Sequence, residues 1–167
     1  AVFSGPRTDI FGNEVNYFTV QEPHSSMEVT LHAQVEVLPV EYLDLNLSPK
    51  WETALVASRE TKDINAYQFT FDSKFVAASP VLSAYALPSF PAGRPFLAAV
   101  SDLTARIHRD FTYDPAATTV STPLDEVMQN RRGVCQDFAH LQIGCLRSLG
   151  VPARYVSGYI CGGEHNG

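Results

Sequence analysis

An alternating pattern of apolar and polar side chains predicts a β-rich start to the chain. In residues 27–37 every second residue is apolar, which is typical of a strand with one buried face. Residues 14–20 predict its antiparallel partner, and residues 22–26 predict the turn between the two strands. Because a hairpin alone is marginal in water, we expect it to belong to a larger sheet, with further strands before Ala1.

The pattern weakens in residues 38–95. Prolines at positions 39, 49, 80, 88, 91 and 95 interrupt it, and one aromatic stretch, residues 66–71, is a strand candidate. We interpret the rest of this region as a connector.

Apolar residues at helical spacing predict three helices after the connector. The first covers residues 95–108, and the second covers residues 123–130, with Thr122 as the predicted capping hydroxyl. The third covers residues 135–149, where a glycine and a proline stop it. The branched and aromatic residues 153–160 then predict a strand that returns against this third helix.

Composition predicts a soluble globular chain. Its 167 residues, 45% hydrophobic and 18% charged, can bury a substantial core. There is no apolar run of the roughly 18 residues that a membrane span needs, and residues 1–6 do not resemble a signal peptide, so we expect a cytoplasmic protein without a membrane partner. The net charge of -6 and the scattered Lys and Arg residues argue against nucleic acid. Three cysteines without a Cys-x-x-Cys motif suggest neither a disulfide framework nor a metal site.

Cys135 stands at the start of the third predicted helix. The free amide groups and partial positive charge of a helix start favour the thiolate, the form of cysteine that attacks carbonyl carbon. Gly133 would let a ligand approach the backbone, and the amide of Cys135 is a candidate donor to a developing oxyanion. On these features alone, an ordinary cysteine packed at a helix start is the simpler interpretation.

The residues around Cys135 favour a nucleophile over an ordinary packed cysteine. The run Arg-Arg-Gly-Val-Cys-Gln-Asp-Phe-Ala-His-Leu at residues 131–141, and its continuation at residues 145–159, closely resemble the core of bacterial transglutaminase-like proteins, which are often described as cysteine proteases. Residues 9–13, the predicted strand before residue 38, and residues 110–113 are also similar to this family, whose members carry a β-rich domain before the core. The resemblance covers most of the chain.

This resemblance implies an α+β fold, with a papain-like transglutaminase core in which the nucleophile helix packs on an antiparallel sheet. Residues 1–90 would hold part of the N-terminal β-rich domain and a connector, and residues 91–167 the N-terminal half of the core, so that the chain is truncated at both ends. The implied enzyme acts on amide or peptide bonds of a protein or peptide substrate. It works by acyl transfer or hydrolysis through a thioester on Cys135, and it needs no cofactor.

The same resemblance implies a Cys-His-Asp triad. The family's histidine lies in a His-Ala-Trp run and its aspartate in an Asp-Pro run, and neither run follows Cys135 in this sequence. At about 100° per residue, His140 is about 140° around the helix from Cys135, so we expect a structural, hydrogen-bonded histidine there. Asp137, about 200° away, is expected to cap the helix start. His165 lies in a loop-like sequence rather than on a rigid element, which argues against a catalytic base there.

The second oxyanion donor is open. Animal transglutaminases are thought to use a tryptophan upstream of the cysteine, but the single tryptophan, Trp51, lies outside the recognisable core. Tyr113 is a candidate because its hydroxyl lies in the family-like run, and a buried tyrosine bonded to the backbone is the alternative. His108, at the end of a helix, is expected to be an exposed polar residue. Arg131 and Arg132 either meet an acidic substrate or are solvated.

Without the histidine and aspartate, we expect this isolated chain to be inactive. One alternative is a non-catalytic binding or scaffold module that keeps the same fold. A second is another enzyme on that fold, such as an arylamine acetyltransferase or a papain-type protease. Exposed sheet edges in a chain cut inside two domains also predict self-association.

Overall fold

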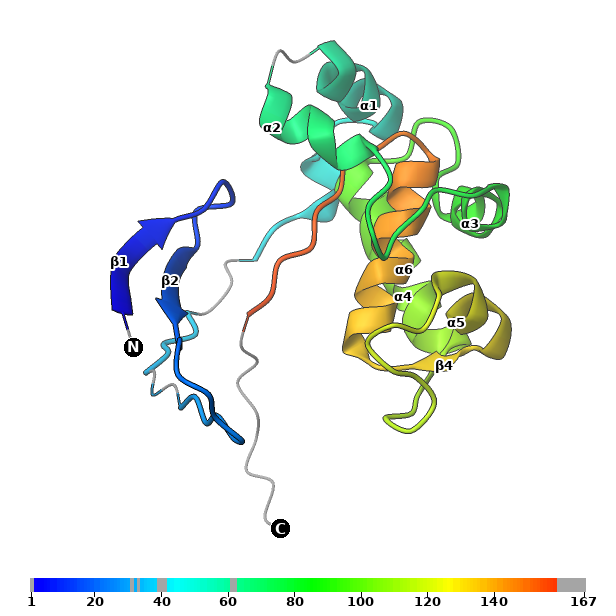
Figure 1. Ribbon diagram of the computed structural model, residues 1–167. Coiled ribbons are helices and arrows are strands. Elements are labelled where there is room, and N and C mark those ends of the chain that lie inside the picture. Colours follow the sequence, from blue (N-terminus) through cyan, green and yellow to red (C-terminus); the bar gives the residue numbers. More distant parts are fainter. Residues whose placement is uncertain (1, 31, 33, 39–41, 61–62, 159–167) are drawn as a thin grey trace. The chain divides into compact units, whose positions relative to one another are not determined.

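The computed structural model describes residues 2–30, 32, 34–38, 42–60 and 63–158 (Figure 1). Residue contacts divide the chain into two units, Ala1–Glu36 and Val37–Gly167. Helices before residue 90 pack with those after it in the second unit. The predicted domain boundary at residue 90 stays a prediction.

The first unit is an antiparallel hairpin of β1 (Val2–Thr8) and β2 (Glu14–Thr19). Its turn is built around Asp9, whose carboxylate accepts hydrogen bonds from the backbone N–H and the side-chain amide of Asn13, each at 2.9 Å. These bonds hold the pKa of Asp9 below its usual value. Gly12 takes a φ of 86°, which a glycine adopts at no steric cost.

The strand predicted for residues 27–37 is wrong for the described residues of this segment, which form no strand and are exposed. Residues 31 and 33 lie outside the described residues. The partner of β2 is β1 instead, and the chain turns at residues 9–13. An alternating pattern becomes a strand only where another strand takes its hydrogen bonds, and here β1 has that place.

The second unit is mostly helical. Its elements in chain order are η1 (Leu45–Leu47), α1 (Trp51–Glu60), α2 (Ile64–Tyr67), η2 (Gln68–Thr70), α3 (Pro80–Ala86), η3 (Leu87–Ser89), α4 (Phe96–Asp110), β3 (Thr112–Tyr113), α5 (Leu124–Asn130), β4 (Arg132–Gly133) and α6 (Cys135–Ser148). The three predicted helices are confirmed as α4, α5 and α6. The cap predicted for α5 is wrong, because Pro123 is the N-cap residue and the Thr122 hydroxyl accepts from the amide of Thr119 at 2.8 Å.

Two further strand predictions are wrong, and residues 38–95 are more than a connector. Residues 66–71 lie in α2, η2 and the residue after them, because the amides of Ala66 and Tyr67 close local hydrogen bonds onto the Asp63 carbonyl at 3.1 Å. Residues 153–158 form no strand; at their start, the carbonyl of Ala153 accepts from the Arg147 guanidinium and its amide donates to the Phe69 carbonyl. The rest of that predicted strand, residues 159–160, lies outside the described residues.

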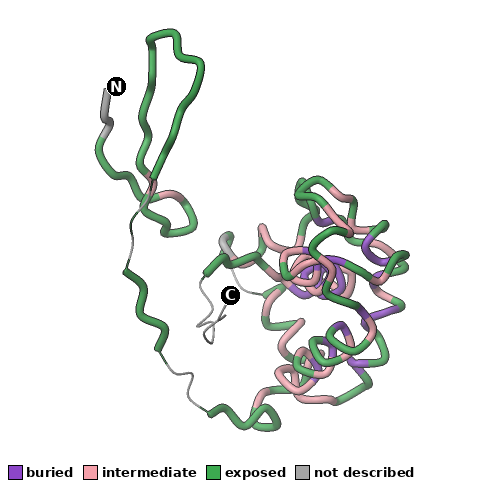
Figure 2. Tube along the Cα trace, turned by 90° about the horizontal axis from the view of Figure 1, so that it is seen from below, coloured by how far each residue is buried: buried purple, intermediate pink, exposed green. Residues whose placement is uncertain are grey.

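Helix α6 lies at the centre of the core. It packs against α3, α4 and α5, and the buried positions among the described residues gather in this helical unit (Figures 1 and 2). Gly144 allows the closest approach, because a Cβ there would lie 2.8 Å from Leu82 and 3.1 Å from Leu124. The fold is α+β, but its antiparallel sheet is the β1–β2 hairpin. Within the described residues, α6 packs on helices and contacts the short strand β4, which pairs in parallel with β3, so the antiparallel sheet expected against it is not among them.

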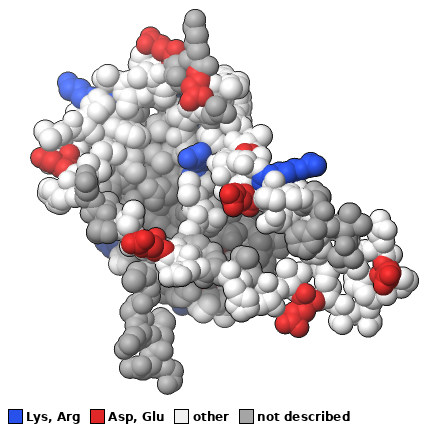
Figure 3. Space-filling model, turned by 90° about the vertical axis from the view of Figure 1, so that its left-hand side faces the viewer, with Lys and Arg blue, Asp and Glu red and all other residues white. Residues whose placement is uncertain are grey.

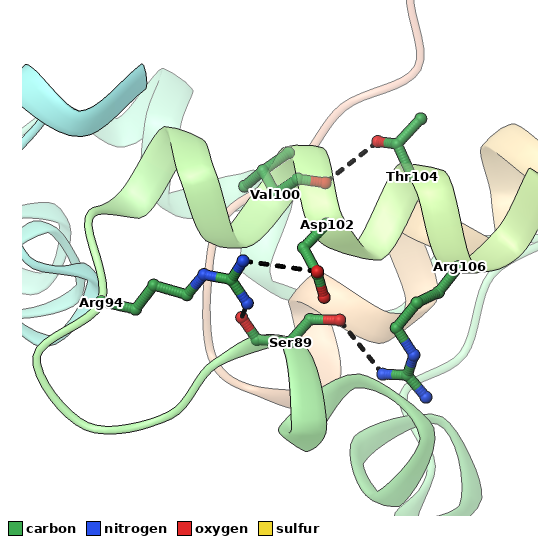
Figure 4. Close-up of polar contacts among 6 residues, drawn as sticks. All are labelled: Ser89, Arg94, Val100, Asp102, Thr104 and Arg106. Carbon is green, nitrogen blue, oxygen red and sulfur yellow. Dashed lines mark hydrogen bonds and ion pairs between the residues drawn. The ribbon is translucent and has the colours of Figure 1, made fainter. Parts of the chain in front are cut away.

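A polar cluster around the buried Ser89 fixes α4 against η3 (Figure 4). Ser89 is fully buried; its carbonyl accepts from Arg94 at 3.2 Å and its hydroxyl from Arg106 at 3.1 Å. Arg94 also pairs with Asp102 at 3.3 Å. A hydrogen bond from Ser89, and then the charge of Arg94, keep the pKa of Asp102 below its usual value. These bonds hold in place the helix that forms one wall of the cavity described below.

Candidate active site

Cys135 is the first residue of α6, and its thiol is exposed. The preceding residue, Val134, is the N-cap, and it has no side-chain acceptor for the helix amides. Asp137 supplies the cap instead: its Oδ2 accepts from the Val134 amide at 2.8 Å and from the Thr118 hydroxyl at 2.6 Å. The predicted capping role of Asp137 is confirmed, and this carboxylate is only 6% exposed.

Gly133 is needed for the approach of Asp137. A Cβ on Gly133 would lie 2.6 Å from Asp137 Oδ2, a distance that the two atoms cannot share. The close approach predicted at this glycine is therefore made by a side chain of the protein. The Gly133 carbonyl also accepts from the Asp114 amide at 2.9 Å, in the parallel pairing of β4 with β3. The backbone before Cys135 is thus held from both sides.

Arg131 and Arg132 have different surroundings. Arg131 ends α5 with a φ of 55°, and its guanidinium lies over the rings of Phe111 at 4.7 Å and Tyr85 at 5.1 Å. Arg132 pairs with Asp114 at 3.3 Å on the surface. Arg131 therefore packs against aromatic rings beside the site, and it is not simply solvated.

A cavity of about 410 Å³ opens beside Cys135. Helices α4 and α6 and the β3 segment line it through Thr104, Ile107, His108, Phe111, Tyr113, Cys135, Phe138, Ala139 and Gln142. The structure thus brings Cys135 and Tyr113, the two predicted site residues, to one cavity. Tyr113 is 61% exposed, so the alternative of a buried tyrosine does not hold.

Sequence reasoning missed the place of His108. It was predicted to be an exposed polar residue, and it is exposed, but it also lines the cavity beside Cys135. The available signal was its spacing from Thr104 and Phe111, because positions four and three residues apart share a helix face. Together with Ile107, these residues line the cavity from the α4 side.

His140 lies in a second cavity, of about 420 Å³, together with Gln136. Its ring stacks on Phe75 at 5.8 Å and meets Tyr155 edge-on at 5.4 Å. Burial lowers the pKa of His140, the charge of Asp137 opposes that shift and Arg147 adds to it. The angular argument that separated His140 from Cys135 agrees with this placement. Its structural role consists of ring contacts, and no hydrogen bond to it is found among the described residues.

The other candidates lie elsewhere. Trp51 donates its Nε1–H to the Pro91 carbonyl at 3.1 Å and packs edge-on against Phe90, so its indole serves the fold. His165 lies outside the described residues. In the parts of the chain that the structure describes, no three His, Cys, Asp or Glu side chains gather closely enough to hold a metal ion.

The surface and the helix lengths carry less information about function. On the face shown in Figure 3, Lys and Arg side chains lie scattered among acidic ones. Among the described helices, none combines the length and apolar character needed to cross a bilayer. The predictions about nucleic acid, membrane, location and self-association stay predictions.

Known proteins resemble this chain in sequence. Residues 91–166 match the family model of the transglutaminase-like superfamily. An uncharacterized protein of Mycobacterium tuberculosis is 41% identical over 155 residues, which are 91% of this chain and 49% of the relative. One from Mycobacterium leprae is 29% identical over 153 residues, 91% of this chain and 52% of the relative. The chain therefore spans about half the length of the curated relatives it matches.

A solved structure is also similar. It is a putative cysteine protease from Cytophaga hutchinsonii, with 30% identity and a TM-score of 0.48 over 54% of this chain and 31% of that one. The family assignment comes from the matched segment, which contains Tyr113, Cys135 and the whole of α6. Residues 91–166 of this chain thus match the transglutaminase-like superfamily, the family that the resemblance implied.

Proposed function

We propose that Cys135 is the nucleophile of a cysteine enzyme that hydrolyses, or transfers acyl groups from, amide bonds of a protein or peptide. The observation that carries this proposal is the exposed thiol at the first residue of α6, beside a cavity. A helix start favours the thiolate, and the cavity leaves room for a substrate next to the sulfur. The match of residues 91–166 to the transglutaminase-like superfamily supports the same chemistry.

In the proposed reaction, the Cys135 thiolate attacks the carbonyl carbon of the amide. The oxyanion that forms accepts hydrogen bonds from the amide of Cys135 and, we propose, from the Tyr113 hydroxyl. Among the described residues no acceptor takes the Cys135 amide, whereas the Val134 amide is bonded to Asp137. The carbon–nitrogen bond then breaks, the amine leaves with a proton, and a thioester remains. Water or a second amine attacks the thioester, and the thiol is released.

The proton transfers in this scheme need a base held by a third group. His140 lines another cavity and Asp137 is bonded to the helix start, so neither serves as partner to Cys135. We propose that a histidine and an aspartate from beyond residue 167 of the longer protein complete the triad. The 167-residue chain alone should then be inactive.

Amidase and transamidase assays on the full-length protein test this proposal. Cys135→Ala should lower kcat/KM by about a thousandfold or more. Cys145→Ala is the matched control, because Cys145 lies on the same helix but is fully buried, and it should keep most of the activity. Activity that survives Cys135→Ala would refute the nucleophile. Turnover by the 167-residue chain that disappears in Cys135→Ala would refute its inactivity. A full-length protein without the two downstream residues would favour the binding or scaffold alternative.

A further inference from the structure

The cavity beside Cys135 has an apolar interior and a polar edge. Ile107 and Phe111 are buried, and Phe138 is half-buried against them. The polar lining residues Thr104, His108 and Tyr113 are exposed. None of the described lining residues is a Lys, Arg, Asp or Glu.

The charged groups next to the cavity have partners of their own. The Asp137 carboxylate is bonded to Val134 and Thr118, and the Arg131 guanidinium lies over the Phe111 ring. A charged side chain in the cavity would lose water without gaining one of these groups as a counter-charge. Such burial is costly, so the cavity discriminates against charged occupants.

Some polar groups at the edge of the cavity are already hydrogen-bonded within the protein. Gln142 donates from Nε2 to the Thr104 hydroxyl at 2.9 Å, and that hydroxyl donates to the Val100 carbonyl at 3.0 Å. The Thr104 hydroxyl therefore has both a donor and an acceptor within the protein. What the cavity offers a ligand is mainly the surface of Ile107, Phe111 and Phe138.

We propose that this cavity binds an uncharged, apolar side chain of the acyl donor, aromatic or large aliphatic, while the scissile carbonyl lies at Cys135. The volume of about 410 Å³ is at the small end of ligand sites, which suits one large side chain. This inference rests on the proposed function of Cys135 and adds the substrate class to it.

Alkylation of the 167-residue chain tests the substrate class without requiring turnover. Three probes share one reactive group: iodoacetamide, N-benzyliodoacetamide and N-iodoacetylglycine. In each, the Cys135 thiolate displaces iodide and a thioether forms, while the thiol proton passes to solvent. Rates are divided by those for glutathione, and peptide mapping of the wild type and of Cys135→Ala separates Cys135 from Cys145 and Cys161.

The benzyl probe should label Cys135 about tenfold faster than iodoacetamide after this correction, with saturation, because its ring is removed from water. The carboxylate probe should show no gain. Ala139→Leu, which fills the cavity beside Cys135, should remove the benzyl preference. Ala105→Leu is the matched control, because Ala105 is exposed on α4 outside the lining, and it should keep the preference.

The outcomes separate this inference from the proposed function. Equal corrected rates for all three probes, or a benzyl preference that persists in Ala139→Leu, would overturn the apolar subsite and leave the nucleophile standing. A faster carboxylate probe would also overturn it. If none of the probes that alkylate glutathione reacted with Cys135, the proposed role of Cys135 as nucleophile would itself be contradicted.

Discussion

The first and last turns of α6 each hold a buried charge, and the two charges serve different purposes. Asp137 is 6% exposed and bonds to Val134 and Thr118, beside Cys135. Arg147 is 8% exposed and bonds to the carbonyls of Phe71 and Ala153. An acid at a helix start and a base at a helix end both complement the helix dipole.

The difference lies in how far the bonds reach along the sequence. Asp137 organises the residues next to Cys135, so the first turn shapes the candidate site. Arg147 donates to Phe71 at 2.9 Å and to Ser73 at 3.0 Å, segments more than seventy positions earlier, so the last turn secures the fold. Burial lowers the pKa of Arg147, and the charge of Asp72 partly opposes this shift. The first turn of α6 therefore organises the candidate site, whereas its last turn stabilises the fold.

The largest effect should come from the scaffold end. Arg147→Met should lower the free energy of unfolding by about 3 kcal/mol, because the carbonyls of Phe71 and Ala153 lose their donor inside the protein. Urea unfolding measures the change. Arg109→Met is the matched control, since Arg109 also lies in the last turn of a helix but is 67% exposed, and it should cost less than about 1 kcal/mol. Equal losses in the two variants would remove the distinction between the two ends of α6.

A smaller effect is expected at the site end. Gly133→Ala should cost about 2 kcal/mol, because the new methyl group displaces the Asp137 carboxylate from the Val134 amide. It should also change the alkylation rate of Cys135, which Arg109→Met should not. Gly158→Ala is the control, because a Cβ there meets nothing within 4 Å. A Gly133→Ala protein with wild-type stability and wild-type Cys135 labelling would contradict the cap described here.

The smallest effect involves His140, between the two ends. Its pKa lies below the ordinary value of 6.5 in the folded chain, mainly through burial, so the unfolded chain binds the proton more readily. The contribution of His140 to the free energy of unfolding should therefore be fully present above pH 7. It should decrease as the pH drops through 6.5. His140→Phe keeps a ring against Phe75 and should show a shallower fall between pH 7.5 and 5.5 in urea titrations. The same slope in both proteins would assign the acid sensitivity to other groups.

Helices α4, α5 and α6 and the strand β2 could be predicted from sequence, whereas helices α1 to α3 and the partner of β2 could not. The bonds of α4 and α6 close within a few residues, so their apolar spacing was enough. Residues 27–37, 66–71 and 153–158 have strand-like composition, but a strand needs a partner that composition does not name. In residues 66–71 the backbone closes local bonds instead.

The residues of the candidate site could likewise be predicted from sequence only in part. Cys135 at the helix start and Asp137 as its cap follow from local sequence, and both predictions agree with the structure. The reach of Arg147 depends on how distant segments pack, so no local pattern predicted it, whereas the helical spacing of His108 from Thr104 was a local signal that was missed. Tyr113 was found only through the family resemblance, and its proposed role as an oxyanion donor stays a prediction.

The pairing of β3 with β4 also bears on how the chain folds. These strands are parallel, and the chain between them must travel through α5 before Arg132 can meet Thr112. Closing that loop costs entropy before any contact repays it, so we expect the Thr112 amide to gain protection from hydrogen exchange late in refolding. A newly made chain would thus expose Cys135 for some time before the cavity beside this residue is complete.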